Sequence, residues 1–344
     1  MKPLILLLTG WLTLPHSPAT AQPAYPTIGQ IVRVDPRLDK LIPPNARIEV
    51  LASGFSWAEG PVWVKQGSAG PHLLFSDVPQ NTIFQWTEKD GLSTFLKPSG
   101  YTGAAPYGDE PGSNGLTVDG QGRLIACEHG DRRVSAMPLT GSGGKQTLAD
   151  SYNGKRLNSP NDVVAHSNGS YYFTDPPYGL PKKDADPTRE TEGFGVYRIA
   201  PARGGLPGTV SLVTNELTRP NGVALSPDEK TLYVAQSDGA NPVIMAYPLS
   251  ADGSAGKGRV VFGAEGLKKQ GLKGGFDGMK VDRDGNIWTT GPGGVLVLSP
   301  TGEFLGHIKT GVATANCAWG DDGTTLYITA DMYLCRVKTT ARGW

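Results

Sequence analysis

The chain of 344 residues has few cysteines and no concentration of charge of one sign. Its three cysteines are an odd number and include no C-x-x-C pair, which excludes a disulfide framework. Cys317 and Cys335 could pair in an exported protein. Because each lies in a strand-like segment with another strand between them, we expect Cys127, Cys317 and Cys335 to be buried free thiols. The 32 basic residues balance 32 acidic ones without a basic stripe, which excludes a typical nucleic-acid partner.

Long apolar runs are also scarce, and the one candidate lies at the N-terminus. Lys2 precedes an apolar segment at 3–14 that is too short to span a bilayer, and "ATA" at 19–21 fits an A-x-A cleavage site. A membrane anchor is the alternative. We expect residues 1–21 to be a signal peptide and the mature protein to be exported, periplasmic or secreted, with no membrane association after cleavage. Residues 22–45 are predicted to form a Pro-rich arm around the outside.

Several catalytic signatures are missing. The chain contains no G-x-S-x-G elbow, no H-E-x-x-H pair and no Walker A loop. We therefore do not expect a serine hydrolase.

Turn residues are plentiful, with 47 glycines and 28 prolines, and strand-like alternation recurs between the turns. Six segments align as repeats, each with a polar residue, a short apolar strand, a turn and a second strand. Spacings of 39 to 60 residues between their starts are typical of propeller blades. We predict an all-β fold, a six-bladed β-propeller over residues 46–344. The polar starts of the six units are Glu59, Asn114, Asn161, Asn221, Asp277 and Asn316.

The last unit has room for only three strands, at 316–319, 325–330 and 333–337. We predict that "ARIEVLASG" at 46–54 supplies the outer strand of this blade and closes the ring, which removes an exposed sheet edge. The long loop at 98–113 leads directly into Asn114 and is expected to act over the site. For the second long loop, at 178–195, a mobile surface insertion is an even alternative.

The innermost strand of a propeller blade lines the central channel, so the six unit starts should converge at its mouth. Two carboxylates and several carboxamides around one point form an oxygen-rich cage, which suits a hard cation such as Ca²⁺. The alternative is that each start is a turn, because Asn-Gly and Asp-Gly are common turn dipeptides. A turn does not explain Glu59, because glutamate has no turn preference. We therefore expect Asp277 to be placed at the channel mouth to bind a cation.

Five motifs lie at the unit starts and turns: "WAEGPVW" at 57–63, "SPNDVV" at 159–164, "FTDPPYGL" at 173–180, "RPNGVALSPDEKTLYVA" at 219–235 and "FDGMKVDRDGNIW" at 276–288. On these motifs the chain resembles the SMP-30/gluconolactonase/LRE-like family of six-bladed propellers, over about 46 to 338. "NGLTVDGQGRLIACEHGDRRV" at 114–134 resembles the bacterial gluconolactonase branch.

The resemblance implies a divalent metal, usually Ca²⁺, with Mg²⁺, Mn²⁺ or Zn²⁺ as alternatives. Its implied ligands are Glu59, Asn161, Asn221 and Asp277, and Asp277 is also the implied general base. Attack by a metal-bound hydroxide is the other route. Animal members have a substrate-binding arginine where this chain has Ser159, so its sugar contacts are expected from elsewhere.

The implied activity is hydrolysis of a small sugar lactone, D-glucono-1,5-lactone to gluconate. Two alternatives stay open: hydrolysis of other lactones or organophosphates, and a non-catalytic binding propeller with structural calcium. His129 could reach the channel or be structural, and Tyr178 could stack on a sugar ring or pack in a turn. The oligomeric state is open. The expected substrate-binding residues are Asn114, His129, Asn161 and Tyr178, with Arg132 and Asp175 as further candidates.

Overall fold

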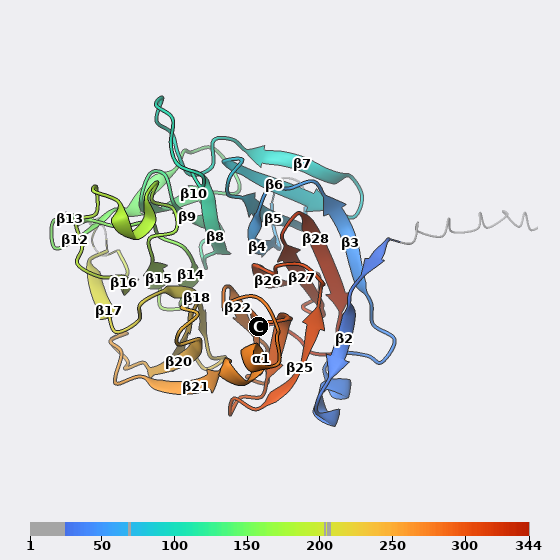
Figure 1. The fold of residues 1–344 in the computed structure, drawn as a ribbon. Helices are drawn as coiled ribbons and strands as arrows, with labels where there is room; N and C mark the ends of the chain where they lie inside the picture. The colour runs from blue at the N-terminus through green and yellow to red at the C-terminus, as the bar shows by residue number, and fades with distance from the viewer. Residues whose placement is uncertain (1–24, 68–69, 203, 205–207, 344) are drawn as a thin grey trace, which may run out of the picture.

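The computed structural model describes residues 25–67, 70–202, 204 and 208–343. The expected signal peptide at 1–21 and the first residues of the arm lie outside this part of the chain. Antiparallel sheets surround a central axis as six blades (Figure 1), which confirms the predicted all-β six-bladed propeller. Within the described residues, no helix has the length and apolar character needed to cross a membrane.

The first four blades are four-stranded sheets whose strands follow one another from the axis outward, except that the hairpin β12–β13 intervenes before the third blade. Their runs of Val, Ile, Leu and aromatic residues, separated by Gly, Asp and Asn turns, are typical of such strands. Blade one comprises β4 (Ala58–Val64), β5 (His72–Asp77), β6 (Thr82–Thr87) and β7 (Gly91–Leu96); blade two comprises β8 (Ser113–Val118), β9 (Arg123–Glu128), β10 (Arg133–Pro138) and β11 (Gln146–Ala149). Blade three comprises β14 (Val163–Ala165), β15 (Tyr171–Asp175), β16 (Gly195–Ile199) and β17 (Val210–Thr214); blade four comprises β18 (Pro220–Leu225), β19 (Thr231–Gln236), β20 (Val243–Pro248) and β21 (Arg259–Gly263).

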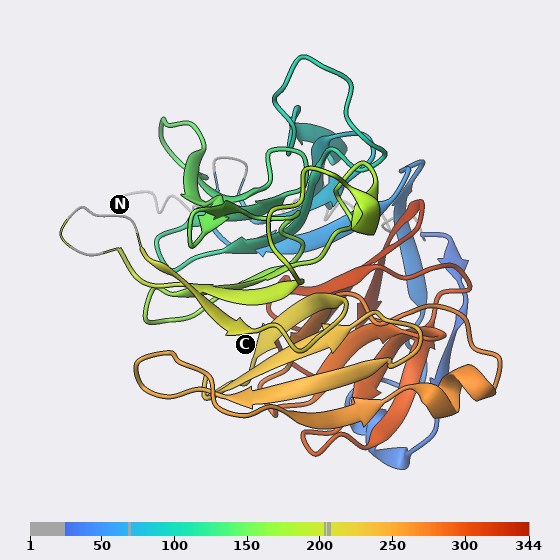
Figure 2. The ribbon, with the colours of Figure 1, turned by 60° about the vertical axis from the view of Figure 1, so that its left-hand side comes forward.

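The last two blades each gain strands from the N-terminus, and their sheets are five-stranded. Residues 25–45 do more than wrap the ring, because two short strands from this segment join two different sheets. In Figure 2 these blue strands run beside the orange and red strands of the last two blades. Blade five comprises β22 (Met279–Val281), β23 (Ile287–Gly291), β24 (Gly294–Leu298), β25 (Phe304–Lys309) and β2 (Gln30–Arg33); blade six comprises β26 (Asn316–Gly320), β27 (Thr325–Ala330), β28 (Tyr333–Lys338), β3 (Ile48–Ser53) and β1 (Thr27–Ile28).

The ring closes where the sequence predicted. Strand β3 pairs antiparallel with β28, and β1 then covers the outer edge of β3. The remaining elements are short and lie between blades: the hairpin β12 (Ser151–Tyr152) and β13 (Lys155–Arg156), the 3₁₀ helices η1 (Pro36–Lys40) and η2 (Lys183–Ala185), and α1 (Glu265–Lys269).

The core lies between blades rather than at the axis. Among the described residues, the buried apolar side chains form clusters, each shared by two neighbouring blades. Strand β27 shows why: Leu326 and Ile328 pack toward blade five, while Tyr327 packs toward blade one. Because alternate side chains point to opposite faces, a strand buried on both faces is apolar at nearly every position.

The three cysteines belong to these clusters, and the prediction of buried free thiols is confirmed. Cys127 packs between blades two and three, and Cys317 and Cys335 pack between blades five and six.

Arg336 of β28 joins the closing strand to the first blade. Its Nε donates to Glu49 of β3 at 2.6 Å and its Nη1 donates to Glu88 of blade one at 2.5 Å. The guanidinium also lies over the rings of Tyr25 and Trp86, at 4.9 and 5.8 Å from their centroids. These contacts tie the last strands of the ring to its beginning.

We expect Arg336→Leu to lower the free energy of unfolding by about 2–3 kcal/mol, since it leaves two partly buried carboxylates without their shared cation. Urea unfolding followed by tryptophan fluorescence measures the change. Arg342→Leu is the control, because Arg342 makes a more exposed ion pair with Asp322 at 3.6 Å and its loss should cost less than about 1 kcal/mol. Equal effects of the two substitutions would contradict this assignment.

Candidate active site

The six polar unit starts lie in one ring around the axis, as predicted. Neighbouring starts are linked in succession through their backbones and side chains. The links are Ser76 Oγ to the Asn114 carbonyl at 2.9 Å, Gly115 N to the Asn161 carbonyl at 2.7 Å, Thr174 Oγ1 to the Asn221 carbonyl at 2.8 Å, Gly222 N to the Asp277 carbonyl at 3.0 Å, Gly278 N to the Ala315 carbonyl at 2.9 Å and Asn316 Nδ2 to Glu59 Oε2 at 3.2 Å.

Irregular pairing at the start of the inner strands explains these links. The ladder register shifts between Glu59 and Val62, between Ser113 and Leu116, and between Pro220 and Val223. Such bulges release backbone groups from the blade's own ladder and re-aim side chains. The released groups then bind the next blade, and the polar side chains gather at the channel mouth.

The glycine after a polar start is required by this close approach. A Cβ at Gly222 would lie 2.1 Å from the Asp277 carbonyl oxygen, and one at Gly60 would lie 2.0 Å from the Asn114 carbonyl oxygen. These are backbone atoms of the next blade, so the clash cannot be relieved by a side-chain rotation.

We expect Gly222→Ala to lower the free energy of unfolding by about 1–3 kcal/mol and to displace Asp277, because the added methyl group forces two inner strands apart. Chemical denaturation and lactone turnover test both effects. Gly120→Ala is the matched control, since a Cβ there meets no atom within 4 Å. A Gly222→Ala protein as stable and active as the Gly120→Ala protein would refute the steric argument.

Glu59 and Asp277 form the anionic side of the ring. Glu59 is buried, and its Oε2 accepts from Gly60 N at 2.8 Å and from Asn316 Nδ2 at 3.2 Å. Burial raises the pKa of Glu59, and burial followed by the charge of Glu59 raises the pKa of Asp277 well above its ordinary value. A cation between them would compensate this repulsion.

The carboxamides divide into two groups. Among the described residues, the buried Oδ1 atoms of Asn114 and Asn221 have no hydrogen-bond donor, and Asn161 is also buried. Asn316 differs, because its Nδ2 donates to Glu59 and its Oδ1 accepts from Cys317 N at 2.9 Å. Asn316 therefore supports Glu59, whereas Asn114 and Asn221 have oxygens free to bind a ligand.

The side chains at the channel mouth have the chemistry that a hard cation requires. Buried carboxamide oxygens without donors, beside two carboxylates whose charges oppose each other, are the oxygen donor set that Ca²⁺ takes. No group of three or more His, Cys, Asp and Glu side chains in the described ranges is arranged to hold a metal ion. The predicted set does not depend on such a group, because it combines two carboxylates with Asn oxygens.

Asp162 is a third buried carboxylate that the sequence reasoning missed. It stands where units one, two, four and five have glycine, and this exception was the available signal. Its Oδ1 accepts from Val163 N at 2.9 Å and its Oδ2 from Val223 N at 3.2 Å, which joins blades three and four. Burial raises the pKa of Asp162, with a smaller opposing effect from Lys280, and its charge adds to the negative potential at Glu59 and Asp277.

Tyr178 reaches the ring through a serine that sequence reasoning also missed. Its hydroxyl lies 2.7 Å from Ser237 Oγ, and Asn221 Nδ2 donates to the same oxygen at 3.2 Å. Ser237 thereby orients the Asn221 carboxamide so that Oδ1 faces away from it. Burial raises the pKa of Tyr178 to about 12, so the hydroxyl stays protonated at neutral pH.

His129 lies beside the two long loops. Its ring is fully buried, its Nδ1 is 3.5 Å from Glu110 Oε2, and neither ring nitrogen has a hydrogen-bond partner among the described residues. Glu110 comes from the loop at 98–113, and its charge adds a minor upward contribution to the pKa of Glu59 and Asp277, after burial. This loop therefore approaches the ring.

Two other positions, Asp175 and Ser159, have structural contacts. Asp175 is buried and accepts from Asn158 N at 2.8 Å, so it supports the segment before Asn161. Burial raises the pKa of Asp175 to about 7. Ser159 Oγ donates to the Pro176 carbonyl at 2.6 Å and accepts from Gly179 N at 3.0 Å, so it is occupied within the fold.

The site candidate Arg132 does not join the ring. Its Nε donates to the Leu157 carbonyl at 2.8 Å and its Nη1 to the Thr188 carbonyl at 3.1 Å, between blades two and three. A cavity of about 780 Å³ opens at the other end of the inner strands and is lined by their later residues, including Lys280. The channel thus has a polar mouth at one end and this separate cavity at the other.

The family model described as SMP-30/gluconolactonase/LRE-like region matches residues 57–331 of this chain, from the first blade into the last. The chain belongs to the SMP-30/gluconolactonase/LRE-like family. This confirms the resemblance inferred from the motifs, and the ring of unit starts described above falls within the matched residues.

Relatives of this family place the chain near bacterial gluconolactonases. It is 42% identical to a gluconolactonase of Zymomonas mobilis over 324 residues, which are 92% of this chain and 88% of the relative. The structure of a gluconolactonase from Xanthomonas campestris superposes with a TM-score of 0.78 at 31% identity, covering 94% of this chain and 99% of that one. A calcium-binding regucalcin from Agrobacterium tumefaciens shares the fold, with a TM-score of 0.63 at 19% identity over 86% of this chain and 94% of its own.

Proposed function

We propose that the protein is a cation-dependent lactonase that opens D-glucono-1,5-lactone to gluconate. Membership of the family and the 42% identical gluconolactonase support lactone hydrolysis. The observation that carries the cation dependence is the ring itself. Among the described residues Asn221 Oδ1 has no donor there, and it lies beside two carboxylates whose pKa values are raised, that of Glu59 mainly by burial and that of Asp277 by burial and then by the charge of Glu59.

In this proposal Glu59, Asn161, Asn221 and Asp277 would hold the cation. When bound, a divalent cation such as Ca²⁺ supplies a Lewis acid that polarises the lactone carbonyl and stabilises negative charge on its oxygen. Mg²⁺, Mn²⁺ and Zn²⁺ are the alternatives that add-back experiments compare.

The chain's own residues perform the proton transfer and the positioning. Asp277 is partly exposed at the mouth, so its carboxylate can accept a proton from the attacking water, and water then adds to the carbonyl carbon. The ring C–O bond then breaks and the ring oxygen takes the proton that Asp277 removed from the water, which gives the hydroxy acid and restores the Asp277 carboxylate. Tyr178 and Ser237 hold Asn221, while Asn114 has a free Oδ1 for a substrate hydroxyl.

A substrate panel tests this proposal. Acid release from D-glucono-1,5-lactone, from an apolar lactone such as γ-undecalactone and from a phosphotriester is followed at constant pH with Ca²⁺ present. We expect the sugar lactone to give the highest kcat/KM, because polar residues surround the mouth. A higher kcat/KM with the apolar lactone or the phosphotriester would replace the proposed substrate class.

Export to the periplasm or outside the cell belongs to the same proposal and is checked separately. N-terminal sequencing of the protein from its native cells should begin at Gln22. A mature chain that begins at Met1 would contradict it.

A further inference from the structure

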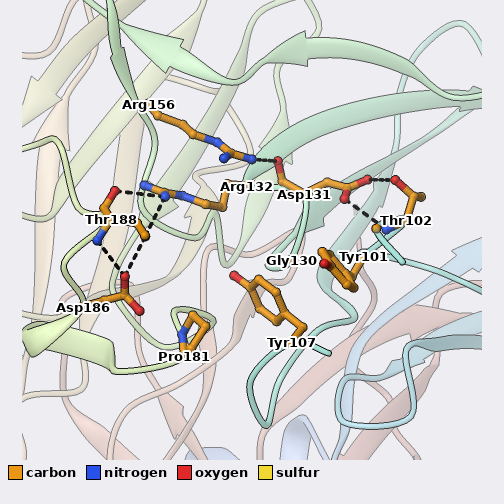
Figure 3. Close-up of a pocket in the computed structure, with 11 residues that line it drawn as sticks. Tyr101, Thr102, Tyr107, Gly130, Asp131, Arg132, Arg156, Pro181, Asp186 and Thr188 are labelled. Atoms are coloured by element: carbon orange, nitrogen blue, oxygen red, sulfur yellow. Dashed lines mark hydrogen bonds between the residues drawn. The ribbon is translucent and has the colours of Figure 1, made fainter. Parts of the chain in front are cut away.

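A second cavity, of about 430 Å³, lies between blades two and three (Figure 3). Its volume is within the range of small-molecule sites. The loop from β7 to β8, the β9–β10 turn, the hairpin strand β13 and the loop from β15 to β16 supply its walls, and none of the ring residues lines it. The residues that matter most are Tyr101, Tyr107, Asp131, Arg132, Arg156 and Asp186.

Arg132 is a buried cation that makes no ion pair among the described residues, although the charges of Asp175 and Glu190 act on it from farther away. The residue is 4% exposed, and its Nε and Nη1 donate to neutral groups of Leu157 and Thr188. Its buried Nη2 has no hydrogen-bond partner among the described residues, and Arg132 lines the cavity. Leaving a charged donor unpaired is costly, so the cavity favours an acceptor at this point.

A second guanidinium strengthens this preference. Arg156 donates through Nη2 to the backbone carbonyl of Asp131 at 3.1 Å, and its guanidinium makes no ion pair in the part of the chain that the structure describes. Burial, followed by the charge of Arg156, lowers the pKa of Arg132, and the charges of Asp175 and Glu190 oppose this with smaller effects. Neighbouring Arg133 shows the contrast, since Glu128 at 2.7 Å and Asp131 at 3.4 Å pair with it.

The two aspartates of the cavity already accept hydrogen bonds, Asp131 from the loop between β7 and β8 and Asp186 from its own loop. Asp131 accepts from Thr102 N at 3.0 Å and Thr102 Oγ1 at 2.8 Å, and Asp186 accepts from Thr188 N at 2.9 Å and Thr188 Oγ1 at 2.6 Å. Their remaining lone pairs can accept from ligand hydroxyls, and their charges disfavour a dianion such as phosphate. An anion with one charge and several hydroxyls satisfies both conditions.

Aromatic side chains complete the cavity. The rings of Tyr101 and Tyr107 lie 4.7 Å apart between centroids at an interplanar angle of 36°. Figure 3 shows the Tyr107 ring beside Pro181, with its hydroxyl toward the centre of the cavity. Such an apolar wall suits the C–H face of a sugar-derived chain.

We propose that this cavity binds the carboxylate of a small polyhydroxy acid, with Arg132 and Arg156 as its anchors. The planar guanidinium matches a carboxylate in geometry and charge. The class of acid is that produced by opening an aldonolactone, so the choice of gluconate as the first ligand rests on the proposed function. Gly108 packs against Pro181, and a bound acid would hold these two loops together.

Titration calorimetry of the Asp277→Asn full-length protein in EDTA tests the cavity without turnover and without a cation in the ring. We expect gluconate to bind with 1:1 stoichiometry, to bind more weakly as NaCl is raised, and to bind at least tenfold more tightly than uncharged sorbitol or phosphate. Arg156→Gln should weaken gluconate binding by about tenfold or more. Arg259→Gln, at an exposed arginine of β21, should leave it unchanged.

Three results would overturn the proposal: no saturable gluconate binding, tighter binding of phosphate, or equal affinity in the Arg156→Gln and Arg259→Gln proteins. Arg132→Lys keeps the positive charge but loses the planar guanidinium, so it should also weaken gluconate binding. If the Arg132→Lys protein does not fold, the Arg156→Gln protein alone tests the cavity. Gluconate binding without turnover of glucono-1,5-lactone by the wild type would refute the proposed function and leave the cavity assignment standing. Turnover of glucono-1,5-lactone without gluconate binding to the Asp277→Asn protein would support the proposed function and refute the cavity assignment.

Discussion

Asp277→Asn is expected to lower kcat for D-glucono-1,5-lactone by about a thousandfold, because it removes the general base. The same change should raise the thermal stability of the protein in EDTA. Asp277 and Glu59 repel each other in the metal-free ring, and burial disfavours the charge of both. A neutral amide at position 277 removes the repulsion and the cost of burying the charge of Asp277. Acid release at constant pH measures kcat, and differential scanning calorimetry in EDTA measures the thermal stability.

Asp252→Asn serves as the control for Asp277→Asn, because Asp252 lies in the exposed turn between β20 and β21. It should leave kcat unchanged. An Asp277→Asn protein that is folded and within tenfold of wild-type kcat would remove Asp277 from the proton transfer. An unchanged or lower melting temperature in EDTA would show that the two carboxylates do not oppose each other in the metal-free state.

Ca²⁺ is expected to raise the melting temperature of the wild-type protein by several degrees, and Glu59→Gln should abolish most of that rise. A ligand at about a hundred times its Kd stabilises the folded state by about 2.7 kcal/mol. In a propeller of this size such a gain is about 4 °C. Glu59 is buried with its carboxylate toward Asn316 and Asp277, so its neutral amide cannot balance the ion.

Scanning calorimetry with and without Ca²⁺ measures this shift, with Glu265→Gln as the control. Glu265 is exposed in the first turn of α1, and its substitution should leave the Ca²⁺ shift intact. A full Ca²⁺ shift in the Glu59→Gln protein would place the bound ion elsewhere in the molecule.

The repeat pattern was sufficient to predict the propeller and its closure. A polar start, an apolar strand and a turn recur along the chain because each blade must expose one end to the channel and bury both faces of its strands. The missing fourth strand of the last unit likewise predicted the role of β3, since an unpaired β28 would be an open edge. The pairing of β2 with β25 was not predicted. The four residues at 30–33 form a strand too short for its pattern of polar and apolar side chains to indicate which blade it joins.

The sequence predicted which residues gather at the channel mouth but not how each is used there. Asn316 matches the other starts in position, yet its carboxamide is committed to Glu59 and Cys317 N. Ser237 was missed because it follows β19, the second strand of its blade, rather than starting a unit, and it contacts Asn221 only after folding. Arg132 was expected near substrate, but its left-handed backbone, with φ of 57°, directs it to the cavity between blades two and three.

The most direct test of the central claim is acid release from D-glucono-1,5-lactone by one protein preparation before EDTA treatment, after it, and after Ca²⁺ is restored. We predict that turnover falls to the spontaneous rate in EDTA and returns with Ca²⁺ in wild type but not in the Glu59→Gln protein. Full turnover by folded protein in EDTA would contradict the claim that the ring of unit starts is a cation-dependent lactonase site.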